Sequence, residues 1–278
     1  TSNGKRDVHS PIDPVGGFKT APGFFNIAHR GASHYAPENT FPAFKLAQTM
    51  RADMIELDVT LTRDHIPVVI HDANLDRTTD GRGPVMNFLS SEILELDAGS
   101  WFSPEFAGVT VPALENVLKW AEDKLLLNIE IKKEAFIKGS GERITGLIHE
   151  LIEEADAFGR VIVSSFSEEA LTDFRSISPK TATAFLMNPY SISPKKVFKQ
   201  MTRIGAHGIN VQPYQMSSRL MSSAKENKLP VWVYTVNDAA DMIRVVNRGG
   251  TGIFTNRPDL LNRVACQLFE GIPPQVEK

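Results

Sequence analysis

Two acidic residues interrupt the apolar stretch MIELDVTL, which covers residues 54–61. Side chains alternate between the two faces of a β-strand, so Glu56 and Asp58 point to the same side of any sheet that this strand joins. A buried carboxylate without a partner is unfavourable by several kcal/mol, and two adjacent ones also repel each other. We therefore expect a metal ion or a pair of basic groups beside them.

The same spacing recurs in LLLNIEIK, residues 125–132, where Glu130 and Lys132 stand two positions apart. If the two strands are neighbours, Glu56, Asp58 and Glu130 point inward together, and one lysine leaves a surplus of negative charge. Carboxylate oxygens are hard ligands that suit Ca²⁺ or Mg²⁺ better than softer metals. The sequence predicts one divalent cation but does not distinguish these two ions.

Basic residues and histidines add a second kind of chemistry. The apolar run 24–29 ends in His29 and continues with Arg30, and His71 follows the run IPVVI. An arginine and a lysine beside a bound cation form a site for phosphate, which assigns this contact to Arg30 and Lys132. Two histidines can transfer protons near neutral pH, one from the nucleophile and one to the leaving alkoxide. We expect phosphoester chemistry, and the sequence does not say which histidine is the acid.

Eight short apolar runs alternate with segments of helical period. Eight strand-then-helix units in succession are typical of a closed (β/α)8 TIM barrel, an α/β fold. The alternative, a doubly wound sheet, usually has a glycine fingerprint after its first strand, and here that strand is followed by HRGAS. The barrel is therefore the predicted fold. The expected strands are residues 24–29, 54–61, 125–132, 161–166, 181–187, 208–212, 231–236 and 252–256.

An interruption follows the second strand. Residues 73–111 lie between that strand and the helix expected in ALENVLKWAEDK, and we interpret them as a small insertion. The run IPVVIHD is predicted to return beside MIELDVTL through the turn TRDH, which would bring His71 near the mouth of the barrel. Residues 24–278 are predicted to form one catalytic TIM-barrel domain, preceded by a flexible leader at residues 1–23.

The composition excludes several classes of protein. Of the 278 residues, 42% are hydrophobic and 23% are charged, which is typical of a globular protein with a full core. The net charge of −3 and the lack of any basic run longer than a pair exclude a nucleic-acid footprint. The single cysteine, Cys266, excludes an internal disulfide and a thiolate metal site, and its apolar helical surroundings predict that it is buried.

The chain has no apolar run near the roughly 18 residues of a transmembrane helix. Its polar leader, which contains Gly and Pro, is typical of what remains after an export signal is removed. We therefore expect an extracellular or periplasmic protein, and a cytoplasmic location stays open as the alternative. The expected partner is a small molecule, and the sequence does not indicate the oligomeric state.

Five separated motifs occur in one order and together resemble the glycerophosphodiester phosphodiesterases. They are AHRGASHYAPENTFPAF, IELDVTLTRDHIPVVIHDANLDRTTDGRG, LDAGSWF, VPALENVL and NIEIK, and the likeness extends from residue 27 to residue 261. The resemblance implies a (β/α) barrel with a small insertion after the second strand. It also implies hydrolysis of glycerophosphodiesters, such as glycerophosphocholine, to sn-glycerol 3-phosphate and an alcohol.

The resemblance further implies a role for each site residue. His29 and His71 are the implied acid/base pair. The implied metal ligands are Glu56, Asp58 and Glu130, and the implied phosphate contacts are Arg30 and Lys132. Glu38 and Asn39 fall at positions that support the site, where they would orient His29 or a metal ligand. Alternatively, Asn39 and Thr40 only cap the first helix.

Two positions depart from the family pattern. Asn256 stands where many relatives have Asp, and Tyr234 stands where Trp is common, and neither is expected to touch the catalytic set. Trp101, Phe102 and Tyr234 are candidates for the wall of a glycerol or head-group pocket, with ordinary packing as the alternative. An apolar groove in the insertion would instead suit a lysophospholipase D. A barrel that only binds phosphodiesters would lack part of the acid/base and ligand set, and every member is present here.

Overall fold

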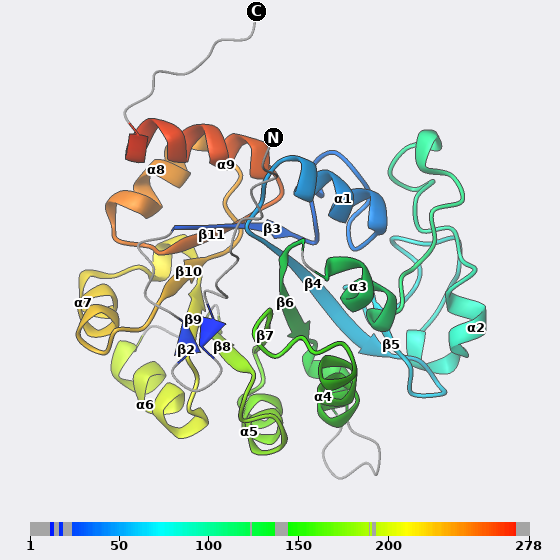
Figure 1. The fold of residues 1–278 in the computed structure, drawn as a ribbon, viewed down its shortest axis with the longest axis horizontal. Coiled ribbons are helices and arrows are strands. Elements are labelled where there is room, and N and C mark those ends of the chain that lie inside the picture. The colour runs from blue at the N-terminus through cyan, green and yellow to red at the C-terminus, as the bar shows by residue number, and fades with distance from the viewer. Residues whose placement is uncertain are drawn as a thin grey trace, which may run out of the picture.

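The structure is a computed structural model that describes residues 12–13, 17–18, 24–122, 124–136, 144–188, 190 and 193–270. Within these residues, eight parallel strands pair side by side, and the first pairs with both the second and the last, so the sheet closes into a barrel (Figure 1). The predicted TIM barrel is confirmed, and every expected strand is present. The strands are β3 (Phe25–His29), β4 (Met54–Leu61), β6 (Leu126–Ile131), β7 (Val161–Ser165), β8 (Ala182–Leu186), β9 (Gly208–Val211), β10 (Val231–Val233) and β11 (Gly252–Thr255).

Helices surround the barrel (Figure 1). Local signals set several of their ends: Ser217 and Asp238 accept hydrogen bonds from backbone N–H groups of the first turns of two helices, and Gly205 ends another in the left-handed conformation. The helices are α1 (Phe41–Thr49), α3 (Leu114–Ala121), α4 (Ile144–Glu154), α5 (Glu168–Ile177), α6 (Pro194–Ile204), α7 (Ser218–Glu226), α8 (Ala239–Asn247) and α9 (Pro258–Ala265), with short turns η3 (Lys133–Ala135) and η4 (Pro213–Gln215).

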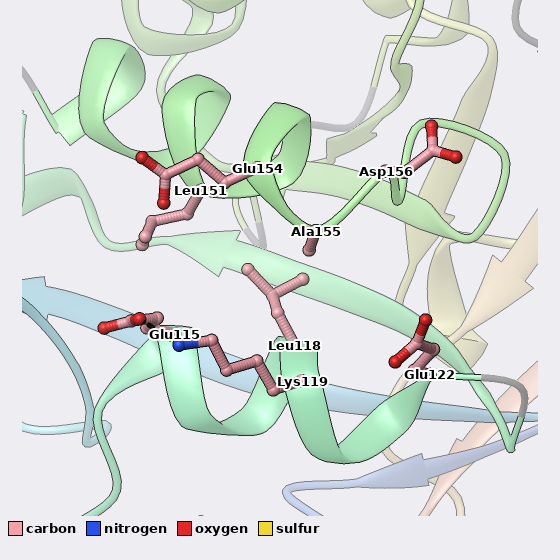
Figure 2. A pocket seen from close by; sticks show the side chains of 8 residues that line it. All are labelled: Glu115, Leu118, Lys119, Glu122, Leu151, Glu154, Ala155 and Asp156. Carbon is pink, nitrogen blue, oxygen red and sulfur yellow. Dashed lines mark hydrogen bonds and ion pairs between the residues drawn. The ribbon is translucent and has the colours of Figure 1, made fainter.

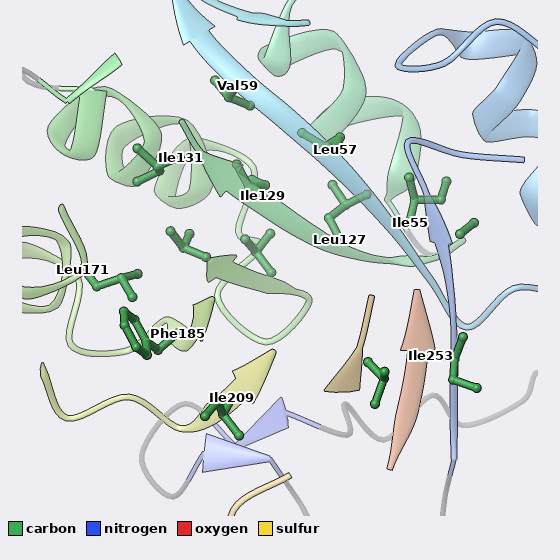
Figure 3. Packing of buried hydrophobic residues seen from close by; sticks show 14 of the residues in the cluster. Ile55, Leu57, Val59, Leu127, Ile129, Ile131, Leu171, Phe185, Ile209 and Ile253 are labelled. Carbon is green, nitrogen blue, oxygen red and sulfur yellow. The ribbon is translucent and has the colours of Figure 1, made fainter. Parts of the chain in front are cut away.

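Alternating side chains divide the strands between two apolar layers. Outward residues, such as Leu57 and Ile131, belong to a large buried cluster between the strands and the helices (Figure 3). Inward residues, such as Met54, Leu126 and Trp232, form a smaller buried cluster inside the barrel. Full burial of each such side chain contributes about 1.5–3 kcal/mol. The same alternation turns the residues on either side of Leu57 toward the barrel interior.

The segment between β4 and α3 has a core of its own. The strand β5 (Pro67–Val69) returns antiparallel to β4, with Val69 opposite Val59, as the sequence predicts. The chain then forms η1 (Val85–Asn87), α2 (Ser90–Ile93) and η2 (Pro104–Phe106). Their apolar side chains belong to a third buried cluster, which includes Val85 and Ile93. The insertion expected at residues 73–111 therefore packs as a small unit beside the barrel (Figure 1).

The two ends of the chain are described only in part. Within the predicted leader, β1 (Ile12–Asp13) pairs antiparallel with β2 (Gly17–Phe18), and the rest of residues 1–23 lies outside the described residues. Cys266 is exposed, so the prediction of burial is wrong. The apolar stripe of α9 does not reach it, because the helix changes there to a wider π-helical turn, η5 (Cys266–Glu270). Among the described helices, none has the length and apolar character needed to cross a membrane.

Candidate active site

Two neighbouring strands, β4 and β6, bring acidic side chains together at the carboxyl end of the barrel, and β3 adds a histidine beside them. The β3–β4 register places His29 opposite Glu56, and the β4–β6 register places Asp58 opposite Glu130. One carboxylate oxygen from each of Glu56, Asp58 and Glu130 lies within 4.8 Å of the other two, and all three residues are buried. The structure therefore brings together the three carboxylates that the sequence predicts to share a site. We call them the carboxylate cluster.

Two basic side chains partly neutralise the carboxylate cluster. Lys132 Nζ lies 3.2 Å from Asp58 Oδ1 and 3.1 Å from Glu130 Oε1. Arg30 Nε lies 3.2 Å from Asp58 Oδ2, and the Arg30 backbone N–H donates to Glu56 Oε2 at 2.9 Å. Asp58 thus contacts both cationic groups, Glu130 contacts one, and Glu56 is held through a backbone N–H.

This uneven distribution of positive charge separates the pKa values of the three carboxyl groups. Burial would raise the pKa of Asp58, but the charges of Arg30 and Lys132 outweigh it and lower this pKa to about 2. Burial and repulsion from Asp58 raise the pKa of Glu130 to about 7, and burial with repulsion from both neighbours raises the pKa of Glu56 well above its usual range. Glu56 and Glu130 therefore favour a bound positive ion, either a proton or a metal cation. Their buried oxygens fit a hard divalent cation.

The loop between β3 and α1 holds the carboxylate cluster in place. Asn39 Nδ2 donates to Asp58 Oδ2 at 2.9 Å, and Asn39 Oδ1 accepts from the Asp58 backbone N–H at 3.3 Å. Glu38 Oε1 accepts from Arg30 Nη1 at 2.8 Å. The N-cap position of α1 is Thr40, not Asn39. Both residues expected to support the site therefore lie in it, where Asn39 orients Asp58 and Glu38 orients Arg30.

The backbone of this loop adopts conformations that most residues avoid. Arg30 and Asn39 have φ angles of 57° and 58°. Non-glycine residues in this left-handed region are unfavourable and tend to occur at functional sites. Next to Arg30, Gly31 has a φ of 82°, and a Cβ atom there would lie 2.7 Å from the backbone of Ala43 in α1. Gly31 thus allows the close packing on α1 that keeps Arg30 beside Asp58.

His29 is held by a residue that we expected to lie outside the catalytic set. Its Nδ1 lies 2.8 Å from Oδ1 of Asn256, directly after β11, and its Nε2 lies 4.0 Å from Glu56 Oε2. The expectation for Asn256 is wrong because closure of the barrel places the end of β11 beside β3. An amide oxygen only accepts hydrogen bonds, so Nδ1 carries the proton and Nε2 is unprotonated. Burial and the charge of Arg30 lower the pKa of His29 to about 4.

His71 is supported by charged side chains at the start of the insertion. Its Nδ1 lies 2.5 Å from Asp72 Oδ1, and Arg77 Nε donates to Asp72 Oδ2 at 2.6 Å. Hydrogen bonds from Arg77 and from His71 lower the pKa of Asp72 to about 2, so this carboxylate is ionised at neutral pH. The backbone N–H of Ile70 donates to the Asp58 carbonyl at 3.0 Å, which brings His71 near the carboxylate cluster. Sequence reasoning assigned no role to Asp72, which follows directly after IPVVIH, or to Arg77, which comes five residues after Asp72.

The residues expected to line a pocket are divided between the barrel and the insertion. Tyr234 follows β10 and donates to the Met187 carbonyl at 3.0 Å. Burial and the nearby charge of Glu130 raise the pKa of Tyr234, which puts its ring close to the carboxylate cluster. Trp101 and Phe102 lie in the insertion and pack edge to face, with ring centroids 5.7 Å apart. Of these three residues, Tyr234 is therefore the one that the charge of Glu130 links to the carboxylate cluster.

A separate pocket lies on the surface between α3 and α4 (Figure 2). None of its lining residues belongs to the carboxylate cluster, and its charge is mainly negative, which disfavours a phosphodiester anion. The lining residues are Glu115, Leu118, Lys119, Glu122, Leu151, Glu154, Ala155 and Asp156.

The fold and the site together define a class of protein. A (β/α) barrel with a buried carboxylate cluster, flanked by two histidines, an arginine and a lysine, has the groups that a barrel phosphodiesterase needs. Residues 29–260 match the model of the glycerophosphoryl diester phosphodiesterase family, and the chain belongs to this family. The resemblance seen in the sequence is confirmed, and the protein is an enzyme with glycerophosphodiester phosphodiesterase activity.

Individual relatives agree with this assignment. The glycerophosphodiester phosphodiesterase of Caldanaerobacter subterraneus is 38% identical over 237 residues, which cover 84% of this chain and 95% of that protein. The crystal structure of a glycerophosphodiester phosphodiesterase from Agrobacterium tumefaciens has a TM-score of 0.74 and 34% identity, covering 84% of this chain and 97% of that one. An Oleispira antarctica phosphodiesterase in complex with the product sn-glycerol-3-phosphate has a TM-score of 0.77 and 27% identity, covering 86% and 95%.

Proposed function

We propose that the enzyme hydrolyses glycerophosphodiesters, such as glycerophosphocholine, to sn-glycerol 3-phosphate and an alcohol, and that it depends on one divalent cation, Ca²⁺ or Mg²⁺. The buried carboxylate cluster between two histidines is the observation that carries this proposal. The product bound to the Oleispira antarctica relative supports the choice of substrate class.

Glu56, Asp58 and Glu130 would hold the cation. Three buried carboxylates carry more negative charge than Arg30 and Lys132 neutralise, since Arg30 also pairs with Glu38. When bound, the cation supplies positive charge to the phosphoryl oxygens on which negative charge develops. The protein's own residues perform the remaining steps.

Arg30 and Lys132 would bind the phosphoryl oxygens. Both groups already lie within 3.2 Å of Asp58, so they are fixed at the edge of the carboxylate cluster before substrate arrives. Fixed positive charge that need not reorganise during the reaction is an effective way to stabilise a transition state. Glu38 keeps Arg30 in place through the bond to Nη1.

His29 would act as the general base and His71 as the general acid. The pKa of His29, about 4, leaves its Nε2 unprotonated at neutral pH and able to take the proton of the attacking hydroxyl. The ionised Asp72 beside Nδ1 of His71 can balance the charge of an imidazolium, which fits His71 to donate a proton to the leaving alkoxide. The attacking group is the neighbouring glycerol hydroxyl, so a P–O bond to it forms as the bond to the alcohol breaks, and a cyclic phosphate remains. Water then opens this ring. His71 takes the proton of the water and His29 returns its proton to the glycerol oxygen, which restores both histidines.

Turnover of glycerophosphocholine with and without a chelator tests the proposal. We expect activity to vanish in excess chelator and to return with added Ca²⁺ or Mg²⁺. Undiminished turnover in chelator would refute the role of the cation. A chelated enzyme treated with Na⁺ at matched ionic strength is the control.

A lysophospholipase D is the second candidate function. Trp101 is 40% exposed in the insertion, where it packs against Phe102, and these apolar rings could contact an acyl chain. Comparison of glycerophosphocholine with lysophosphatidylcholine separates the two candidates. A kcat/KM value that is higher for the lysophospholipid would favour the second.

A further inference from the structure

Arg77 joins two parts of the site that are far apart in the sequence. Its Nε and Nη2 donate to Asp72 at 2.6 and 3.2 Å, and its Nη1 and Nη2 donate to Glu38 at 3.0 and 2.7 Å. The guanidinium therefore binds both oxygens of each carboxylate. Arg77 is 43% exposed, whereas Glu38 is only 14% exposed, so the arginine covers a carboxylate that is nearly out of water.

Each of these carboxylates holds a group of the proposed mechanism. Asp72 accepts from His71 Nδ1 at 2.5 Å, and Glu38 accepts from Arg30 Nη1 at 2.8 Å. We propose that Arg77 is a positioning residue that fixes His71 through Asp72 and Arg30 through Glu38. This inference rests on the proposed roles of those two residues, to which Arg77 is joined through Asp72 and Glu38.

The order of charges from Asp72 through Arg77 to Glu38 explains why a positive group is needed at position 77. Asp72 and Glu38 are both negative, and Arg77 is the positive group that lies between them. Without Arg77 the two carboxylates would repel each other, Asp72 would lose the partner that aligns it with His71, and Glu38 would be left with Arg30 alone. Arg30 would then be drawn from Asp58 toward Glu38.

A lysine at position 77 could not make the same paired hydrogen bonds to Asp72 and Glu38. A guanidinium presents several N–H donors in a rigid plane and can make paired bonds to two carboxylates at once, whereas an ammonium acts as a point charge. Arg77→Lys would keep the charge between Glu38 and Asp72 but lose the paired bonds. The conservative variant therefore separates the effect of charge from the effect of orientation.

The test compares Arg77→Ala and Arg77→Lys with wild type, and uses Arg82→Ala, which removes an exposed arginine from the same segment, as the matched control. We expect kcat to fall by about 10- to 100-fold in Arg77→Ala, with a smaller rise in KM, because loss of a residue that orients a reacting group acts mainly on the chemical step. Arg77→Lys should be intermediate, and Arg82→Ala should match wild type.

Measurement of kcat in millimolar guanidinium chloride separates a positioning role of Arg77 from a purely structural one, because added guanidinium would not restore kcat if Arg77 only stabilised the fold. We expect it to restore part of kcat in Arg77→Ala, and to leave wild type, Arg77→Lys and a sodium chloride control unchanged. Wild-type kcat in Arg77→Ala would overturn the inference, as would a loss that follows a lowered Tm and does not respond to guanidinium. If Arg77→Ala fails to fold, wild-type kcat in Arg77→Lys would overturn it. An inactive wild-type enzyme would instead refute the proposed function.

Discussion

The Nδ1 atom of His29 lies 2.8 Å from the amide oxygen of Asn256, although the two residues are 227 positions apart in the chain. This contact fixes the tautomer of the proposed base without placing a negative charge beside it. The bond itself raises the pKa of His29, but burial and the charge of Arg30 outweigh it and lower this pKa to about 4. His29 is therefore neutral over the whole range in which most enzymes are assayed.

Replacement of Asn256, the neutral partner of His29, should change how kcat/KM depends on pH. A base must be unprotonated, so kcat/KM of the wild type should fall only as the pH decreases through about 4, the pKa of His29. In Asn256→Asp, a carboxylate would stabilise the imidazolium and shift this acidic limb upward by about 1 to 2 pH units. Kinetics across the acidic range at saturating cation measure the shift. An unchanged limb would remove either Asn256 or His29 from the proposed step.

Cation affinity should depend on pH through Glu130. The carboxyl pKa of about 7 means that a proton competes for the site in acid, so the Kd for Ca²⁺ or Mg²⁺ should rise as the pH falls below about 7. Calorimetric titration of the chelated enzyme at several pH values tests this. Glu130→Gln should bind the cation more weakly and with a smaller dependence on pH, because Glu56, whose pKa is also raised, still binds a proton at the site. Equal affinity from about pH 8 to about pH 5.5 in wild type would contradict the prediction.

The same raised pKa predicts how the stability of the cation-free enzyme depends on pH. Glu130 binds its proton more tightly in the folded state, so its contribution is present below about 4.5, the pKa of the unfolded chain, and is lost as the pH rises through about 7. Tm of the chelated enzyme should decrease across this interval and should recover when the cation is added. Glu130→Gln, which carries no charge to repel, should reduce this decrease, and the remainder belongs to Glu56, whose pKa is also raised. A decrease of wild-type size in that variant would assign it to other groups.

The two histidines should respond differently to the leaving group. A general acid matters most when the departing alkoxide is strongly basic, so His71→Ala should lose about 100-fold or more with glycerophosphocholine and far less with a nitrophenyl diester. His29→Ala should lose similar factors with both substrates, because attack still needs a base. The ratio of kcat values for the two substrates is the measurement. The reverse pattern would exchange the two assigned roles.

His207 should make the fold sensitive to acid at a distance from the site. Its Nδ1 accepts the Thr183 backbone N–H at 3.1 Å, and burial with the charge of Arg175 lowers the pKa of His207 to about 4. The unfolded chain binds a proton near pH 6.5 and the folded chain only near 4, so stability is full above about 6.5 and decreases as the pH falls toward about 4.

We expect this loss to be about 1 to 2 kcal/mol, because partial exposure screens the effect. The free energy of unfolding from denaturant titrations at several pH values measures it. His207→Gln keeps an acceptor but cannot be protonated and should flatten that part of the curve. His65→Gln, at an exposed position, is the control for the exchange of a histidine for glutamine.

Local patterns were sufficient to predict the barrel and the carboxylate cluster. The spacing of Glu56, Asp58 and Glu130 on strands determines their direction, and the order of strands determines that they are neighbours. Two contacts could not be predicted in this way. Asn256 lies 227 residues from its partner His29, and Arg77 lies 39 residues from its partner Glu38. Whether such loops meet depends on how the barrel closes and on how the insertion packs against it. Cys266 was placed wrongly because an apolar stripe does not reveal where a helix changes its winding.

The antiparallel pairing of β5 with β4 positions His71, the proposed general acid, independently of the loop that follows it. His71 comes only two residues after β5, so main-chain pairing with β4 sets its position before most of the insertion begins. Exposed residues beyond Thr79 can therefore be exchanged to alter which head groups are admitted while His71, the proposed proton donor, stays in register, as long as the buried cluster that joins Ile70 to Val85 and Ile93 is kept. Redesign of specificity in this enzyme should begin there.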